Sequence, residues 1–150
     1  MKEQLKRARQ MLDSLIKAIQ QLPESASRNN AITRLTEARF LLGNTLNILG
    51  ENPYANHALK TGTVLVDAPA DVALEAEPID VSTKDEQIKS IKWLRARLED
   101  FLRKFHPTFE DTITEKKGVA LFIDSSRVNV HLAKAWLGVM FSELGAPIGK

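Results

Sequence analysis

Two short stretches of the sequence combine a hydroxyl, a fixed cation and an amide, the groups that bind phosphate in many proteins. Residues 27–30 read Ser-Arg-Asn-Asn, and residues 125–129 read Ser-Ser-Arg-Val-Asn. Each stretch lies where we expect a helix to begin, and the free N–H groups and the dipole at a helix N-terminus favour an anion. Helix capping and solvation alone also account for these residue types. The side chains that could contact a phosphate are Arg28, Asn30, Arg127 and Asn129.

Patterns typical of catalysis or metal binding are missing from the sequence. The three histidines, His57, His106 and His131, lie on separate segments, and none has the spacing of a zinc site on one helix face. The seven glycines form neither a Walker loop nor a dinucleotide fingerprint. With no cysteine, thiol catalysis and cysteine-ligated zinc are excluded. We therefore predict a protein that is not an enzyme and that needs no metal or cofactor.

The composition is that of an ordinary globular chain. Of the 150 residues, 43% are hydrophobic and 27% are charged, and the net charge is only +2. This surplus suits a few phosphates better than a nucleic-acid polymer, although Lys89, Lys92, Arg95 and Arg103 could form a basic face. No apolar run is long enough to cross a membrane, and the absence of cysteine fits a reducing compartment. We predict one domain, residues 1–150, in the cytoplasm.

The first fifty residues predict two antiparallel helices. Apolar residues recur at three-and-four spacing over residues 2–22, and Pro23 ends that helix. The second helix should start at an N-cap, Ser27, and run to about Leu49, with Gly50 in the left-handed conformation just after it. A link this short predicts that the two helices form a hairpin.

A long acidic connector, residues 51–82, separates this hairpin from a second one in residues 83–146. A capping box at residues 83–86 opens the third helix, which Pro107 should end after His106. The fourth helix should begin near Ser125 or Ser126 and end at Gly145. The run 119–123 reads either as an early start of that helix or as a strand that pairs with residues 63–66. The predicted fold is therefore mainly α, two tandem antiparallel hairpins, with a two-stranded β element left open.

The two hairpins resemble each other in sequence. Residues 38–50 match residues 133–145 at a constant offset of 95, with Leu42-Gly43 aligned on Leu137-Gly138. Aligning residues 35–38 with residues 132–135 gives an offset of 97 instead. The sequence does not decide between these two registers. The aromatic residues Trp93, Phe101, Phe105, Trp136 and Phe141 have helical spacing, which favours packing over stacking on a base.

A resemblance to a known family rests on two motifs, RNNAITRLTEARFLLG at residues 28–43 and RVNVHLAKAWLG at residues 127–138. Both are similar to the helical-hairpin domain of phage anti-CBASS and anti-Thoeris sponge proteins. Leu41 stands where that family has tryptophan, and Val130 where it has threonine. Each copy therefore departs from the family pattern at one position, which puts ligand binding by both copies in question.

The resemblance implies a non-enzymatic sponge that sequesters the cyclic di- or trinucleotides of bacterial immune systems, in the cytoplasm of the host. It also implies a homo-oligomer with ligand pockets between subunits. The first copy matches the motif at Arg28 and Thr33, and we add Asn30, Arg34 and Tyr54 on physical grounds, because an amide can read a base edge, an arginine can bind a phosphate and an aromatic ring can stack on a purine. In the second copy the candidates are Arg127 and Asn129.

One chain could supply both members of a pair of hairpins, so that three chains build a hexamer of hairpins. The alternative function is an oligomeric helical structural or protein-interaction factor without a small-molecule ligand. Its partner surface would be an apolar patch of Trp136, Phe141 and residues 119–123.

Overall fold

The computed structural model describes residues 2–50, 76–110 and 119–145, and every regular element in them is a helix. The predicted all-α class is therefore confirmed for these residues. The candidate strand at residues 63–66, Tyr54 and most of the connector lie outside the described residues. The four helices are α1 (Lys2–Ile19), α2 (Ala26–Ile48), α4 (Lys84–Glu110) and α5 (Val119–Glu143).

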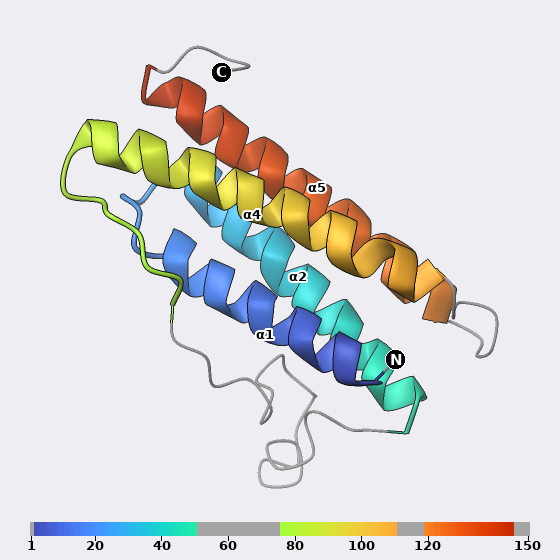
Figure 1. The fold of residues 1–150 in the computed structure, drawn as a ribbon. Coiled ribbons are helices and arrows are strands. Elements are labelled where there is room, and N and C mark those ends of the chain that lie inside the picture. Colours follow the sequence, from blue (N-terminus) through green and yellow to red (C-terminus); the bar gives the residue numbers. More distant parts are fainter. Residues whose placement is uncertain (1, 51–75, 111–118, 146–150) are drawn as a thin grey trace, which may run out of the picture.

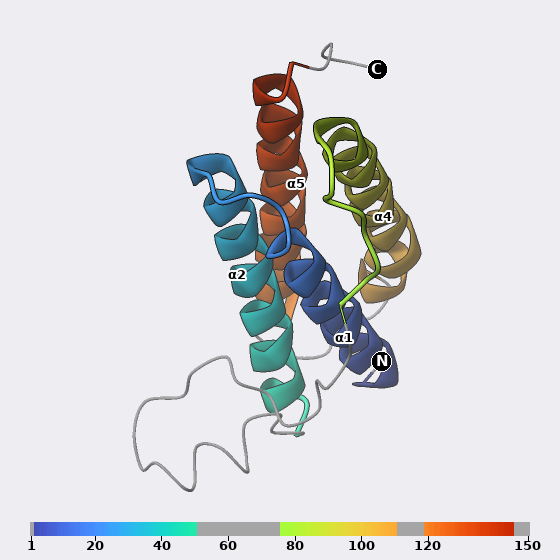
Figure 2. The same cartoon turned by 90° about the vertical axis from the view of Figure 1, so that its left-hand side faces the viewer.

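The helices pack as a bundle (Figure 1). The most extensive contact joins α2 to α5, whereas α1 lies against α2, α4 lies against α5, and α1 touches α4 only lightly. Figures 1 and 2 show that each of these neighbouring pairs runs in opposite directions. Helices α2 and α5, each the second helix of its half of the chain, therefore form the centre of the molecule.

The core consists of the apolar residues that recur at helical spacing on the inner face of each helix. It is continuous across all four helices. Its largest fully buried apolar side chains are Leu5, Leu12, Leu15, Ile19, Leu35, Leu42, Leu46, Ile91, Leu94 and Leu98.

The start of α2 corrects one prediction. Ser25, and not Ser27, is the N-cap: its backbone is extended and its hydroxyl accepts a hydrogen bond from the Arg28 N–H at 3.1 Å. Ser27 is buried within the first turn and donates a hydrogen bond to the Glu143 carboxylate at the end of α5. At the other end of α2, Gly50 has a φ of +95°, so the predicted left-handed residue is confirmed.

The bounds of α4 are confirmed at its start and wrong at its end. The Thr83 hydroxyl accepts a hydrogen bond from the Glu86 N–H at 3.1 Å, as the capping box predicts. The helix then continues past Pro107 to Glu110. Proline removes one N–H donor, and so close to the end of a helix this costs a single hydrogen bond of the last turns rather than the helix itself.

The predicted start of α5 at Ser125 or Ser126 is wrong, because the helix begins at Val119. Val119 and Ile123 are both buried, one helical turn apart on the inner face. The apolar run 119–123 is therefore the beginning of the last helix and not a strand. Short apolar runs fit either element, so the sequence alone could not separate the two.

The burial pattern fits an offset of 95 between α2 and α5. Leu35 and Ala38 are buried, and so are the residues 95 positions later, Val130 and Ala133. An offset of 97 would align Leu35 with Leu132, which is 37% exposed. The residue pairs buried at both positions are Ala31/Ser126, Leu35/Val130, Ala38/Ala133, Leu42/Leu137, Thr45/Met140 and Leu46/Phe141.

A network of three charged side chains occurs in both halves of the bundle. In the first half, Asp13 on α1 forms ion pairs with Lys17, at 2.8 Å, and with Arg39 on α2. In the second half, Glu99 on α4 forms ion pairs with Arg103, at 3.8 Å, and with Lys134 on α5, at 2.7 Å. The members on α2 and α5 are again 95 residues apart, and those on α1 and α4 are 86 apart.

The segment that enters α4 lies over the first half of the bundle. The Glu77 N–H donates to the Ser14 carbonyl on α1 at 3.3 Å, and the Glu77 carboxylate pairs with Arg97 on α4 at 3.1 Å. The Ser90 hydroxyl donates to the Asp80 carbonyl at 2.7 Å. These contacts join α1 to α4, whose direct contact is slight.

Candidate functional site

Arg28, the first predicted phosphate ligand, already has partners within the bundle. Its guanidinium donates to the Gln20 carbonyl at the end of α1 and to the Asn29 side chain, both at 3.2 Å. The arginine therefore closes the turn between α1 and α2, and its side chain is half-buried there.

Thr33 and Asn30 lie in the first turns of α2. Thr33 is exposed, and its hydroxyl donates to the Asn29 carbonyl at 2.9 Å, a bond within its own helix. Asn30 is half-buried. Tyr54, which follows the other end of the second helix in the sequence, falls outside the described residues, so its part in a site stays a prediction.

Arg34 and Asn129 are the two predicted residues that the fold brings together. The Arg34 guanidinium lies 3.5 Å from the Asn129 side-chain oxygen, a long contact. Asn129 is buried, and its amide also donates to the Ser125 carbonyl at 2.9 Å. The two positions are equivalent under the offset of 95, and they meet where α2 packs against α5.

Arg127 does not lie at a helix N-terminus, which corrects the second predicted phosphate site. Because α5 begins at Val119, residues 125–129 lie in its second and third turns, where backbone N–H groups bond within the helix. Arg127 instead pairs with Asp124 at 3.3 Å. Given the antiparallel contact at Arg34, it lies more than two turns, roughly 12 Å, along the bundle from Arg28. Within one chain, Arg28 and Arg127 are therefore not brought together.

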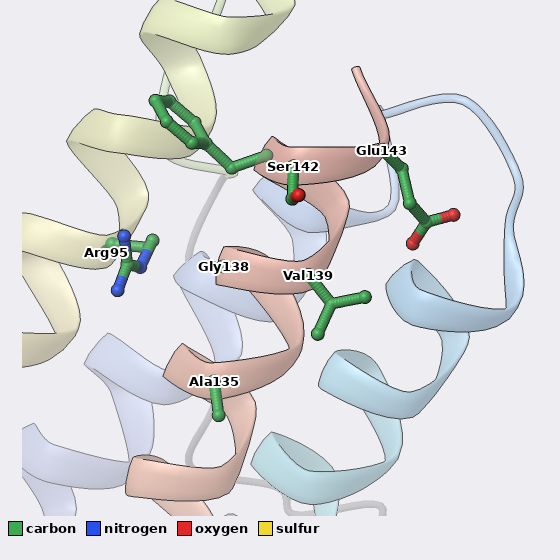
Figure 3. A pocket seen from close by; sticks show the side chains of 7 residues that line it. Arg95, Ala135, Gly138, Val139, Ser142 and Glu143 are labelled. Atoms are coloured by element: carbon green, nitrogen blue, oxygen red, sulfur yellow. The ribbon is translucent and has the colours of Figure 1, made fainter. Parts of the chain in front are cut away.

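A hollow in the described surface lies between α4 and α5 (Figure 3). Its volume is about 530 Å³, and its walls are mostly apolar. It extends along the last turns of α5. The lining residues are Arg95, Ala135, Gly138, Val139, Phe141, Ser142 and Glu143.

Arg95 places a guanidinium in this hollow without a partner among the described residues. It lies against Gly138: a Cβ added to that glycine would be 3.5 Å from the Arg95 Cζ. Its Nε is buried and donates a hydrogen bond to no group of the described chain. The other charged lining residue, Glu143, is already bonded to Ser27 on α2. A cation beside apolar walls, with open N–H groups, is suited to an anionic ligand.

The corresponding arginine of the first half is packed away. Arg9 is 86 residues before Arg95, and α1 and α4 share their buried positions at this offset, as the buried residues Leu5 and Ile91 show. Arg9 is fully buried and donates to the Arg39 carbonyl at 2.6 Å. The sequence interpretation missed Arg95 because it was counted with an exposed basic face. Its position within the apolar spacing of residues 91–98 was the available signal.

The aromatic residues mostly pack, as predicted. Phe101, Phe105 and Phe141 are buried, and Trp136 is half-buried against the core. Trp93 is 39% exposed and borders a shallower hollow of about 300 Å³ formed with residues 78–80 and the start of α4. The Arg97 guanidinium lies over the Trp93 ring at 5.9 Å, so a cation already covers part of this ring.

The apolar patch of the alternative function has a different composition from the one predicted. Phe141, Val119 and Ile123 are buried, with 5% or less of each residue exposed, so they do not form an exposed patch. The exposed large apolar residues of α5 are Leu121, Val128, Leu132 and Val139.

Among the described residues, two carboxylates have a lowered pKa, and each has a structural cause. The hydrogen bond and charge of Lys134 lower the pKa of Glu99, with smaller contributions from Arg103 and His131. Hydrogen bonds from the Ser82 hydroxyl and N–H lower the pKa of Asp80. Both carboxylates are thereby held ionised, a state that suits a structural ion pair better than a proton donor.

Within residues 2–50, 76–110 and 119–145, no group of three or more acidic or histidine side chains could hold a metal ion. None of the helices in these ranges is both long and apolar enough to cross a membrane. Comparison of the chain with protein-family models, with curated proteins and with solved structures found no match.

Proposed function

We propose that this protein binds and sequesters a cyclic di- or trinucleotide of bacterial anti-phage defence, without turning it over. The observation that carries the proposal is the guanidinium of Arg95, which has no partner in the described chain and lies in the hollow between α4 and α5. The class of ligand comes from the resemblance of residues 28–43 and 127–138 to phage sponge proteins. By the same resemblance, the protein acts in the cytoplasm of the host bacterium.

The chemistry of the hollow supports an anion that carries apolar or aromatic groups. A guanidinium offers two parallel N–H donors to phosphate oxygens, and its charge acts more strongly beside apolar walls than in open water. The apolar walls supply area for a base or a ribose. A volume of about 530 Å³ is within the range of sites for small molecules, roughly 300–1,000 Å³.

The shared burial pattern and the repeated charge network support the interpretation that the two helix pairs are copies of one hairpin. In that interpretation the first copy uses its arginine, Arg9, inside the core, whereas the second copy leaves Arg95 open. We therefore expect one ligand site per chain, in the second copy. The contact of Arg34 with Asn129 then lies at the junction of the copies.

The alternative, an oligomeric interaction factor without a ligand, is favoured by one observation. Leu121, Val128, Leu132 and Val139 expose a line of apolar side chains along α5. Such a surface is typical of a site that another protein covers. The two functions are compatible, because a binding protein can also be an oligomer.

A thermal-shift and calorimetry screen against cyclic dinucleotides, cyclic trinucleotides and linear dinucleotides tests the proposal. A ligand that binds only the folded protein raises Tm by mass action. We expect a cyclic nucleotide to raise Tm and Arg95→Gln to abolish the rise. Arg103→Gln is the matched control, since Arg103 is on the same helix with its side chain 75% exposed, and it should leave the rise unchanged.

Recovery of the ligand tests the absence of turnover. After hours with the protein and then denaturation, chromatography should return the cyclic nucleotide chemically unchanged. A linear or hydrolysed product would contradict sequestration. No response to any cyclic nucleotide at several hundred micromolar would overturn the proposal as a whole.

A further inference from the structure

The outward face of α5 carries a continuous line of apolar and small side chains. Leu121 is 66% exposed, Val128 50%, Leu132 37% and Val139 45%. Ser125, Ala135 and Ser142 fall between and after them, so that the spacing alternates strictly between four and three residues. This is the period of the contact line between two helices that pack along their length. We call these seven residues the α5 stripe.

The stripe is not required by the fold itself. At an offset of 95, Val128, Leu132 and Val139 correspond to Thr33, Glu37 and Asn44 on α2. Those residues are polar, although α2 shares its buried positions with α5. Apart from Ala26 and the half-buried Phe40, this face of α2 is therefore polar, whereas the same face of α5 carries four exposed large apolar side chains. A difference confined to the outer surface indicates that α5 has a partner outside the chain.

We propose that the α5 stripe pairs with the α5 stripe of a second copy of this chain, with the two helices antiparallel. A two-fold axis at the level of Val130 places Leu121 against Val139 of the second copy, and Val128 against its Leu132. Every large apolar contact then joins one leucine to one valine, with the small residues Ser125 and Ala135 opposite each other. A parallel pairing would instead stack leucine on leucine and valine on valine, which spaces the helices unevenly.

Charge and helix direction also favour this pairing. The seven stripe residues carry no charge, so two copies bring no like charges together along the contact line. Antiparallel helices also place their dipoles favourably. The line from residue 121 to residue 139 is roughly 27 Å long, which gives two 25-residue helices a shared contact over most of their length. A contact in which each copy uses the same surface closes at two copies and leaves no stripe exposed.

The inference goes beyond the proposed function and does not depend on it, since no ligand enters the pairing. The two surfaces nevertheless meet: Ala135, Val139 and Ser142 belong both to the stripe and to the wall of the hollow. In the pair, the first turns of the second copy's α5 would cover that side of the hollow. Pairing and ligand binding can therefore be tested separately and then together.

A charge-swap experiment tests the pairing and its direction. Light scattering of the ligand-free chain at about 100 µM should give twice the mass of one 16.8 kDa chain. Val128→Lys alone and Leu132→Glu alone should each give the mass of one chain. An equal mixture of the two variants should return to twice that mass, because the antiparallel pairing sets residue 128 opposite residue 132.

Cysteine cross-linking gives a second readout, made simple by the absence of cysteine from the chain. Leu121→Cys and Val139→Cys should each remain uncrosslinked on oxidation and should form a disulfide-linked pair when mixed. Circular dichroism and Tm show that each variant is folded, which is expected because all four positions are exposed. Self-crosslinking of Leu121→Cys would overturn the antiparallel arrangement.

A wild-type chain with the mass of one copy at 100 µM would overturn the pairing altogether. A wild-type pair that Val128→Lys and Leu132→Glu both leave intact would overturn the assignment to α5. If the chains do not pair but still bind a cyclic nucleotide, only the pairing is overturned. If the chains pair but bind no cyclic nucleotide, only the proposed function is overturned.

Discussion

The two halves of the bundle share an interior and differ in what they expose. Six equivalent pairs of positions on α2 and α5 are buried in both, and both halves hold an acidic residue between two basic ones. Yet Arg9 is fully buried in the core while Arg95 faces a hollow, and the outward face of α2 is mostly polar while that of α5 is mostly apolar. The shared features determine the fold, because they are the ones that must be buried or paired. The differing features concentrate the candidate functions in the second half.

The largest expected effects come from equivalent core leucines. Leu42→Ala and Leu137→Ala should each lower the free energy of unfolding by about 2–5 kcal/mol, because both side chains are fully buried. Leu132 is the residue that an offset of 97 would align with the buried Leu35. Leu132→Ala should lower the free energy of unfolding by less than about 1 kcal/mol, because its side chain is partly exposed. Urea denaturation measures the free energy of unfolding of all three variants. A loss in Leu137→Ala as small as that in Leu132→Ala would contradict the equivalence of Leu137 and Leu42.

Substitution of Arg9 should mainly lower stability, whereas substitution of Arg95 should mainly abolish ligand binding. Arg9→Ala removes a fully buried side chain and its bond to the Arg39 carbonyl, so we expect a loss of about 2–4 kcal/mol. Arg95→Ala should cost less than half of that and should abolish the thermal shift by ligand. The Tm of each variant, measured with and without cyclic nucleotide, checks the loss of stability and the loss of the thermal shift. Equal destabilisation by the two substitutions would show that Arg95 is as structural as Arg9.

The repeated charge network should be stronger in the first half. Asp13 has a side chain 8% exposed, against 34% for Glu99. Asp13→Asn deprives the half-buried Arg39 of this carboxylate and should cost about 2–3 kcal/mol, whereas Glu99→Gln should cost below about 1 kcal/mol. Denaturation of the two variants side by side measures this difference. A larger loss of stability in Glu99→Gln than in Asp13→Asn would contradict the claim that the more buried network contributes more to stability.

The smallest effect is a pH dependence from Glu99. Lys134 lowers its pKa from the ordinary value of 4.5, so the ion pair stabilises the fold fully above that value. The stabilisation is lost as the pH falls below 4.5 and through the lowered pKa of the folded state. Lys134→Met should flatten the acid limb of a stability–pH profile by an amount below about 1 kcal/mol, since the pair is partly exposed. An acid limb that Lys134→Met leaves unchanged would show that Lys134 is not the cause of the pH dependence from Glu99.

Much of this fold could be predicted from the sequence, and the failures have a common cause. Three-and-four spacing predicted the helices, and Thr83 and Gly50 indicated two of their ends, because these signals are local. The end of α4 and the start of α5 were misplaced, since Pro107 is tolerated near a helix end and the run 119–123 fits a helix or a strand. The offset of 95 needed burial to separate it from 97.

The candidate site was less predictable than the fold. Arg28 and Arg127 were chosen for nearby helix starts, but one closes a turn and the other pairs with Asp124 inside α5. The sequence places Arg95 within the apolar spacing of residues 91–98, but that it lies beside Gly138 of α5 and pairs with no described residue is visible only in the folded chain. Such a site is defined by tertiary contacts, which a local sequence pattern does not contain.

Calorimetric titration with cyclic nucleotides tests the central claim most directly, provided that Arg95→Gln and Arg28→Gln are measured beside the wild type. We predict one ligand per chain for the wild type and for Arg28→Gln, and no detectable binding to Arg95→Gln. Binding that survives Arg95→Gln and disappears in Arg28→Gln would contradict the account, because it would place the site at the start of α2.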